Sequence, residues 1–151
     1  MQRTFYNPGT MHPSAACFKL VREFEGLKTH SYDDGVGNWT IGYGHTRGVH
    51  PGQHITSATA ENFLSQDMEE AARDVRELVS AEITQGMFDA LCSFIFNLGA
   101  YNFKRSTLRK LINERRYDEA ALEFQKWDMA GHHHLPGLAR RRDAEAELFS
   151  S

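Results

Sequence analysis

Two acidic residues, with a hydroxyl shortly after them, form the group in this sequence that is best suited to chemistry. Glu25 and Asp34 are nine residues apart, and Thr40 follows six residues later. Glycoside hydrolysis needs a protonated carboxyl group that gives its proton to the leaving oxygen, and a charged carboxylate that activates water or attacks carbon. Two acids in different surroundings can hold these two states at one pH.

The expected surroundings of the two acids differ in the required way. Glu25 ends an apolar helix face beside the negative end of the helix dipole, and both conditions favour its protonated form. Asp34 lies among glycines in a polar turn, where water and backbone N–H groups keep it ionised, and the Thr40 hydroxyl can hold a water against it. By itself the pair is weak evidence, because a helix-terminal Glu paired with an Arg, plus an Asp that serves a turn, is the commoner arrangement.

Helical periodicity and cap residues predict the elements that position these groups. A helix is expected over residues 14–25, a hairpin or three-stranded sheet over 29–47, and a long helix from the cap Thr56 to about Val79. Shorter helices are expected at about 84–97, 106–115, 118–129 and 137–149, the first three capped by Thr84, Ser106 and Asp118. Residues 1–13 contain Pro8, Gly9 and Pro13 without periodicity, which predicts a flexible or loosely docked arm.

These elements predict an α+β fold with a single domain over residues 14–151. A β-lobe is expected at about 26–56 and a connecting helix at about 57–79. The helical lobe takes in about 80–151 together with the first helix.

The composition is that of a globular chain, with 151 residues, 40% hydrophobic and 25% charged. No apolar stretch is long enough for a bilayer and the first fifteen residues lack the apolar centre of a signal peptide, so synthesis in the cytoplasm is expected. Cys17 and Cys92 lie in apolar helical contexts without metal-ligand spacing, which predicts reduced core residues and no metal or other cofactor. The apolar stripes are accounted for by internal packing, so a monomer is expected.

Three consecutive arginines, Arg140–Arg142, raise nucleic-acid binding as an alternative. Asp143, Glu145 and Glu147 follow at once and no aromatic residues are interleaved. A helix with internal ion pairs is therefore favoured, and no nucleic-acid partner is expected.

The run from Glu25 to His45, EGLKTHSYDDGVGNWTIGYGH, resembles the catalytic signature of the phage-type lysozymes, or endolysins. That signature has Glu, eight residues, Asp, five residues, Thr, and then Ile-Gly-x-Gly-His, and every element is present here at matching spacing. The likeness continues in QGMFDALCSFIFNLG (85–99), in Ser106-Thr107-Leu108 and in the closing segment from Trp127 to Arg142. The matching segments run in order over about residues 15–149.

The resemblance implies a two-lobed lysozyme fold with a glycan cleft between the lobes. It implies hydrolysis of the β-1,4 bond between N-acetylmuramic acid and N-acetylglucosamine in bacterial peptidoglycan, and lysis of the host cell for phage release. Glu25 would be the proton donor, Asp34 the water-activating carboxylate and Thr40 a supporting hydroxyl, with one of Arg140–Arg142 paired with Glu25. His45 would help to order the β-lobe near the acids. Substrate contacts are expected at His45, Phe96, Asn97 and Thr107.

The chain departs from the family pattern in two places. Where relatives often have Ala-Gly-Gly-Lys, this chain has Ala130-Gly131 followed by His132-His133-His134. A solvated polar loop is favoured there over a sugar-contacting loop or a metal site, because consecutive residues do not converge on one ion. Many relatives also carry an N-terminal membrane-arrest segment, whereas the arm here is polar. Passage from the host cytoplasm to the periplasm is therefore expected to depend on a separate pore-forming protein, a holin, without membrane insertion of this chain.

Two alternative functions stay open beside hydrolysis. A lytic transglycosylase needs no water-activating carboxylate, so Asp34 argues against it. A non-catalytic peptidoglycan-binding protein would not need the intact set of Glu25, Asp34 and Thr40.

Overall fold

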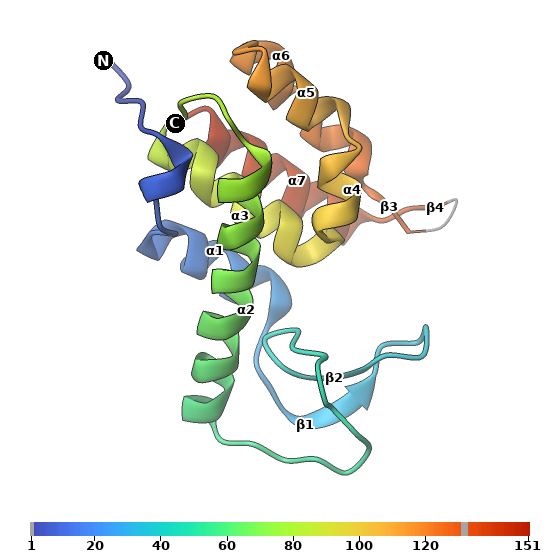
Figure 1. Cartoon of the computed structure of the whole chain (residues 1–151). Helices are drawn as coiled ribbons and strands as arrows, with labels where there is room; N and C mark the ends of the chain where they lie inside the picture. The colour runs from blue at the N-terminus through green and yellow to red at the C-terminus, as the bar shows by residue number, and fades with distance from the viewer. Residues whose placement is uncertain (1, 131–132) are drawn as a thin grey trace.

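A 22-residue helix, α2 (Ser57–Leu78), joins a small β-containing lobe to a larger helical lobe in the computed structural model, which describes residues 2–130 and 133–151 (Figure 1). Thr56 caps α2 as expected, because its side-chain oxygen accepts a hydrogen bond from the backbone N–H of Thr59 at 3.1 Å. One end of α2 packs on the strands and the other on the helices, so the helix sets how the two lobes face each other.

The β-lobe is a two-stranded antiparallel hairpin of β1 (Lys28–Asp33) and β2 (Trp39–Gly42). Tyr32 pairs with Thr40 in its register. The segment that follows adds an isolated bridge between His30 and His54 but no third strand. A small apolar cluster of Ile41, Ile55 and Ala60 fixes the hairpin against the first turns of α2. The α+β class is confirmed, with the hairpin as the form that the sheet takes.

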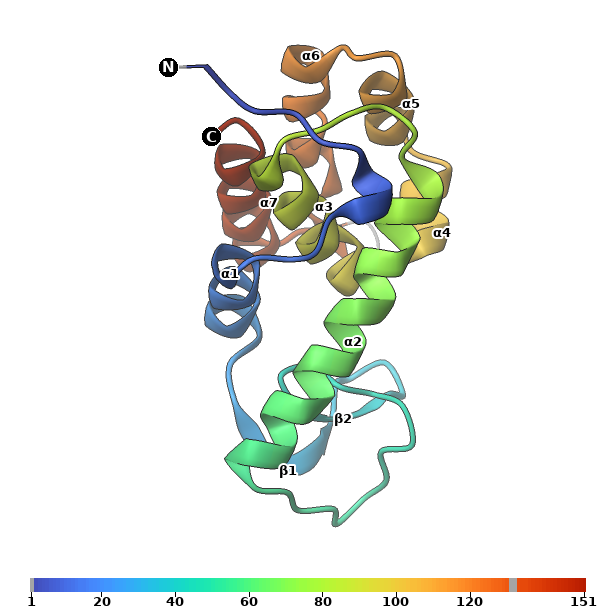
Figure 2. The ribbon, with the colours of Figure 1, turned by 60° about the vertical axis from the view of Figure 1, so that its left-hand side comes forward.

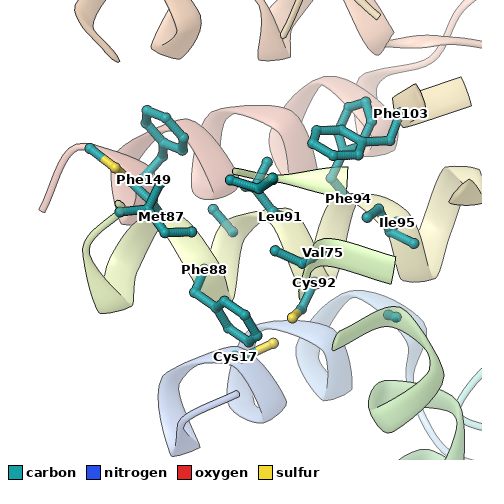
Figure 3. Close-up of a cluster of buried hydrophobic side chains, with 14 of the residues drawn as sticks. Cys17, Val75, Met87, Phe88, Leu91, Cys92, Phe94, Ile95, Phe103 and Phe149 are labelled. Atoms are coloured by element: carbon teal, nitrogen blue, oxygen red, sulfur yellow. The ribbon is translucent and has the colours of Figure 1, made fainter. Parts of the chain in front are cut away.

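The centre of the helical lobe is α3 (Gln85–Leu98), whose residues from Met87 to Ile95 are all buried. Most of these residues are apolar, and a helix of that composition is expected to be enclosed by its neighbours. It packs against α1 (Ala15–Glu25) and α2, and most extensively against α7 (Pro136–Phe149), as Figure 3 shows for the side chains at their junction. Gly86 permits the close approach of α3 to the C-terminus, because a Cβ there would come 2.3 Å from the carbonyl oxygen of Leu148.

The remaining helical segments are short and cover the far side of α3: α4 (Ala100–Lys104), α5 (Thr107–Asn113), α6 (Tyr117–Ala121) and the 3-10 helix η2 (Phe124–Trp127). The prediction of one helix over 118–129 is wrong, since α6 begins after Arg116 rather than Asp118 and stops before η2. The tighter winding of η2 places Phe124 and Trp127 on one side, where both rings meet Phe94 edge-on at 5.8 and 5.6 Å between centroids. Helix α4 and the two-residue strands β3 (Met129–Ala130) and β4 (His133–His134) were not predicted.

The N-terminal segment lies along the helical lobe, as Figure 2 shows. Tyr6 and Ile83 exchange two backbone hydrogen bonds, and Met11 is buried beside the short 3-10 helix η1 (Pro8–Thr10). Arg76 of α2 donates from Nε to the Met11 carbonyl at 2.9 Å. These contacts dock residues 6–12, although their irregular sequence predicts no element.

The two cysteines are free and fully buried, as predicted. Figure 3 places Cys17 of α1 and Cys92 of α3 together in the core, and burial and the neighbouring Cys17 thiol raise the pKa of Cys92 well above its usual value. No helix in the described part of the chain is both long and apolar enough to cross a membrane.

Candidate active site

The two acids predicted to be catalytic line one hollow between the lobes. Asp34 and Thr40 reach it from the hairpin, Glu25 from the end of α1, and Phe96 and Asn97 from the end of α3. Tyr32, Gly44 and Thr46 complete its wall. Five residues proposed from the sequence therefore meet in space, although they lie as far as 72 residues apart in the chain.

Glu25 is the last residue of α1, where Gly26 ends the helix with a φ of 70°. Its Oε2 lies 2.6 Å from Nη1 of Arg141 on α7, so Arg141 is the member of Arg140–Arg142 that pairs with it. The side chain of Glu25 is 19% exposed and that of Arg141 only 4%. The pairing fixes one carboxyl oxygen from behind, while Oε1 lies against the backbone of Gly44, a residue of the hollow.

Asp34 is held by the turn between β1 and β2. Its Oδ1 accepts backbone hydrogen bonds from Val36 at 2.9 Å and Asn38 at 3.1 Å, and its Oδ2 accepts one from the Asn38 side-chain amide at 3.2 Å. These donors, first among them the Val36 N–H, lower the pKa of Asp34. Gly35 and Gly37, both with φ of 90°, give the turn the shape that brings the donors round the carboxylate. Asp34 is exposed to solvent, and these hydrogen bonds favour its ionised form.

Thr40 and Tyr32 face each other across the hairpin and both line the hollow. The Thr40 hydroxyl makes one long hydrogen bond, to the Asn38 carbonyl at 3.4 Å. Burial, followed by the charges of Glu25 and Asp34, raises the pKa of the Tyr32 phenol, which keeps it a neutral hydrogen-bond donor. Sequence reasoning missed Tyr32 because a tyrosine in a strand is ordinary, and only the register to Thr40 places it beside the acids.

Phe96 and Asn97 close α3 at the edge of the hollow. The Asn97 Oδ1 accepts a hydrogen bond from Arg142 Nη2 at 2.9 Å, and within the described residues its Nδ2 has no partner. The carboxamide is thus oriented with its donor group available to a ligand.

His45 and Thr107 lie outside this hollow. Nδ1 of His45 lies 2.7 Å from Oδ2 of Asp67 on α2, and its ring stacks on Phe63 at 4.1 Å between centroids. It therefore fixes the β-lobe to α2 immediately beside Gly44. Thr107 lines a separate hollow formed by α5, α6 and η2, so the structure does not bring it together with the acids.

Two further hollows share lining residues with this one, and the three together form one groove. One continuation shares Gly44, Thr46 and Phe96 with it and carries the acids of α2, Asp67, Glu70 and Asp74. The other shares Glu25 and Asn97 and is lined by Leu135–Leu138 and Arg140 at the start of α7. Burial raises the pKa values of Asp67 and Asp74. A groove open in both directions past a pair of acids suits an extended chain better than a small molecule.

The histidine run follows the two-residue strand β3 and includes strand β4. Gly131 and His132 lie outside the described residues, and Nδ1 of His134 is 2.7 Å from Oδ1 of Asp128. Over residues 2–130 and 133–151, no three His, Cys, Asp or Glu side chains come close enough together to hold a metal ion.

Comparison with known proteins points to one family. The family model described as phage lysozyme matches residues 22–145. An endolysin of Acyrthosiphon pisum secondary endosymbiont phage 1 is 39% identical over 145 residues, which cover 93% of this chain and 99% of that protein. An endolysin of Bacillus phage B103 is 40% identical over 92% of this chain, which spans only 54% of that longer protein.

Among solved structures, the chain is similar to the muramidase domain of SpmX from Asticaccaulis excentricus. The TM-score is 0.88 at 36% identity, and the match covers 93% of this chain and 99% of that domain. A likeness over this much of both chains confirms the lysozyme-like fold.

Proposed function

This chain belongs to the phage lysozyme family, and we propose that it is a muramidase that hydrolyses the β-1,4 bond between N-acetylmuramic acid and N-acetylglucosamine in bacterial peptidoglycan. The endolysin and muramidase names of its relatives support a peptidoglycan-degrading enzyme as the broader class. The observation that carries the finer proposal is the presence of Glu25 and Asp34 in one groove, with different environments.

Glu25 is proposed to be the general acid. Arg141 holds Oε2 from behind, which leaves Oε1, beside Gly44, to carry the proton. That proton passes to the bridging oxygen as the bond from this oxygen to the anomeric carbon breaks. Asp34, ionised by its three donors, takes a proton from the water whose oxygen forms the new bond to the anomeric carbon. Exchange of both protons with solvent restores the starting state.

Recognition of the acetamido sugars is proposed to involve Asn97. Its free Nδ2–H group can donate to an acetamido carbonyl, because Arg142 occupies the oxygen of the same amide. Phe96 offers an apolar surface beside it at the edge of the groove. We propose Tyr32 and Thr40 as further polar contacts near the reacting bond.

The position of Asp34 favours hydrolysis over the two alternatives. A transglycosylase closes the sugar's own hydroxyl on the anomeric carbon and has no use for a second ionised carboxylate in the same hollow. A protein that only binds peptidoglycan does not require a carboxylic acid in the position of Glu25, at the end of a helix between the buried Arg141 and the backbone of Gly44.

The test is analysis of the fragments released from purified Gram-negative peptidoglycan by the wild-type protein, Glu25→Gln and Asp34→Asn. Asp33→Asn is the matched control, since Asp33 precedes Asp34 and, within the described residues, its side chain accepts a hydrogen bond from the Gly35 N–H of its own turn and from no other group. We expect fragments with reducing muramic acid ends from the wild type and the control, and a loss of about 10²–10⁴-fold in both active-site variants. Anhydro ends would indicate a transglycosylase, and no fragments at all would indicate the binding protein.

Host lysis and the need for a holin stay predictions that rest on the resemblance. Both are tested by inducing the chain in a bacterial host with and without a separately encoded holin. Lysis is expected only with both genes and a functional Glu25. Lysis without the holin would mean that the chain reaches the periplasm by another route.

A further inference from the structure

A buried network of charges lies behind the groove, on the α7 side. Arg141 and Arg142 are adjacent, yet their guanidinium groups serve different groove residues, Glu25 at 2.6 Å and Asn97 at 2.9 Å. Glu145 follows one turn later and meets both arginines. Its Oε2 lies 3.4 Å from Arg141 Nε, and its Oε1 lies 2.7 Å from Arg142 Nε.

Glu145 is more deeply enclosed than the residues it organises. Its side chain and that of Arg142 are 0% exposed, and Ser93 of α3 donates a hydrogen bond to its Oε2 at 2.5 Å. Burial raises the pKa of Glu145, while the two arginines oppose that effect. Buried ion pairs are often no more stabilising than apolar side chains of the same volume. Stability alone therefore does not account for three charges in the core of this lobe.

We propose that Glu145 is a positioning residue for the reaction. It holds Arg141 against Glu25 and Arg142 against Asn97, and thereby fixes the proton donor and the sugar-binding amide relative to each other. Glu145 lines none of the hollows of the groove, so it acts only through the two arginines. This inference rests on the roles proposed above for Glu25 and Asn97.

The spacing of α7 explains how one carboxylate reaches both arginines. Residues three and four positions apart lie on the same helix face, so Glu145 is adjacent to Arg142 and to Arg141 at once. The two guanidinium groups then diverge, one toward α1 and one toward the end of α3. Loss of the Glu145 charge would remove the carboxylate that balances the two arginines from within α7. Their positive charge would then act more strongly on Glu25.

The charges around Glu25 define the expected effect on pH dependence. Tyr32 and Asp34 face Glu25 from the hairpin, Arg141 contacts it from α7 with Arg142 and Glu145 behind, and Glu23 and Arg140 line the adjoining part of the groove. Removing the negative charge of Glu145, which contacts both Arg141 and Arg142, favours loss of the proton from Glu25. The alkaline limb of activity should then move to lower pH.

The experiment compares the wild type, Glu145→Gln and the control Glu147→Gln. Glu147 lies on the same helix, is exposed and has no ion pair within the described residues. Two quantities are measured: kcat/KM on purified peptidoglycan from pH 3 to 9, and the ¹³C NMR titration of the Glu25 carboxyl, assigned with Glu25→Gln. For Glu145→Gln we expect a loss of about 10–100-fold in kcat/KM, and a downward shift of about half a pH unit in both the alkaline limb and the carboxyl titration. The control should match the wild type.

An unchanged titration and an unchanged profile in Glu145→Gln would overturn the proposal. The titration needs no turnover, so a wild-type protein that releases no fragments would overturn the muramidase function while the role of Glu145 is still tested. If Glu145→Gln does not fold, Glu145→Asp takes its place. That variant keeps the charge but cannot span both arginines, so the titration should stay in place while kcat/KM falls; wild-type kcat/KM would contradict the positioning role.

Discussion

A β-carbon on Gly44 would lie 2.6 Å from Oε1 of Glu25 and 3.0 Å from its Cδ. The backbone of Gly44 also has a φ of 77°, in the region that favours glycine. Position 44 therefore requires glycine for two separate reasons, the shape of the chain after β2 and the room needed by the proposed proton donor.

These two reasons are separated by comparing Gly44→Ala with Gly52→Ala. Gly52 has the same φ of 77° but nothing within 4 Å of an added Cβ. Both variants should lose about 1–2 kcal/mol of unfolding free energy from the backbone. Only Gly44→Ala should lose activity against bacterial cell walls, by about 100-fold, because its methyl group displaces the Glu25 carboxyl group. Denaturant unfolding and turbidity assays measure the two effects, and equal activity in both variants would show that the contact does not matter.

The pH dependence of the reaction should follow from the turn around Asp34. Its pKa is lowered, so the carboxylate persists, and activity is retained, as the pH falls below the usual value for an aspartate. Asn38→Ala removes the side-chain donor at 3.2 Å and should move the acid limb of kcat/KM to higher pH, with the alkaline limb unchanged. A shift of the alkaline limb instead would assign the two acids the opposite roles.

The pairing of His45 with Asp67 should contribute more to stability than the neighbouring pairing of Arg47 with Glu70. The His45 side chain is 9% exposed, whereas that of Arg47 is 74% exposed. Asp67→Ala leaves a buried ring nitrogen without its partner and should lower the unfolding free energy by about 1–3 kcal/mol. Glu70→Ala breaks a surface ion pair worth about 0–1 kcal/mol. Thermal unfolding of both variants tests the difference, and an equal loss would contradict it.

The buried thiols should be unreactive in the folded protein. Burial raises the pKa of Cys92, so the thiolate that attacks alkylating reagents is scarce even at pH 9. Mass spectrometry after treatment with iodoacetamide should show no adducts in native buffer and two in denaturant. In denaturant, the single variants Cys17→Ala and Cys92→Ala should each show one adduct. Rapid modification of the native protein would mean that α1 opens from α3.

Sequence patterns predicted several features whose physical cause is local. The caps Thr56, Thr84 and Ser106 accept the hydrogen bonds expected of them, because a cap and its N–H partner lie three residues apart. Cys92, predicted to be a core residue from its apolar helical context, is buried. The helix predicted over 118–129 failed because Phe124 and Trp127 turn toward Phe94, a demand set by a residue some 30 positions away.

The sequence by itself determined the types and spacing of the acids and the glycine-rich turn round Asp34, because each lies in a short stretch of chain. It also determined the family, because the motifs of that family follow one another in order along the chain. Only the tertiary structure decided that Arg141 pairs with Glu25, that Tyr32 joins the groove, that Thr107 does not, and that Arg142 contacts Asn97. Those contacts join residues up to 116 positions apart. Their geometry is set by how α1, α3 and α7 pack, and no local pattern carries that information.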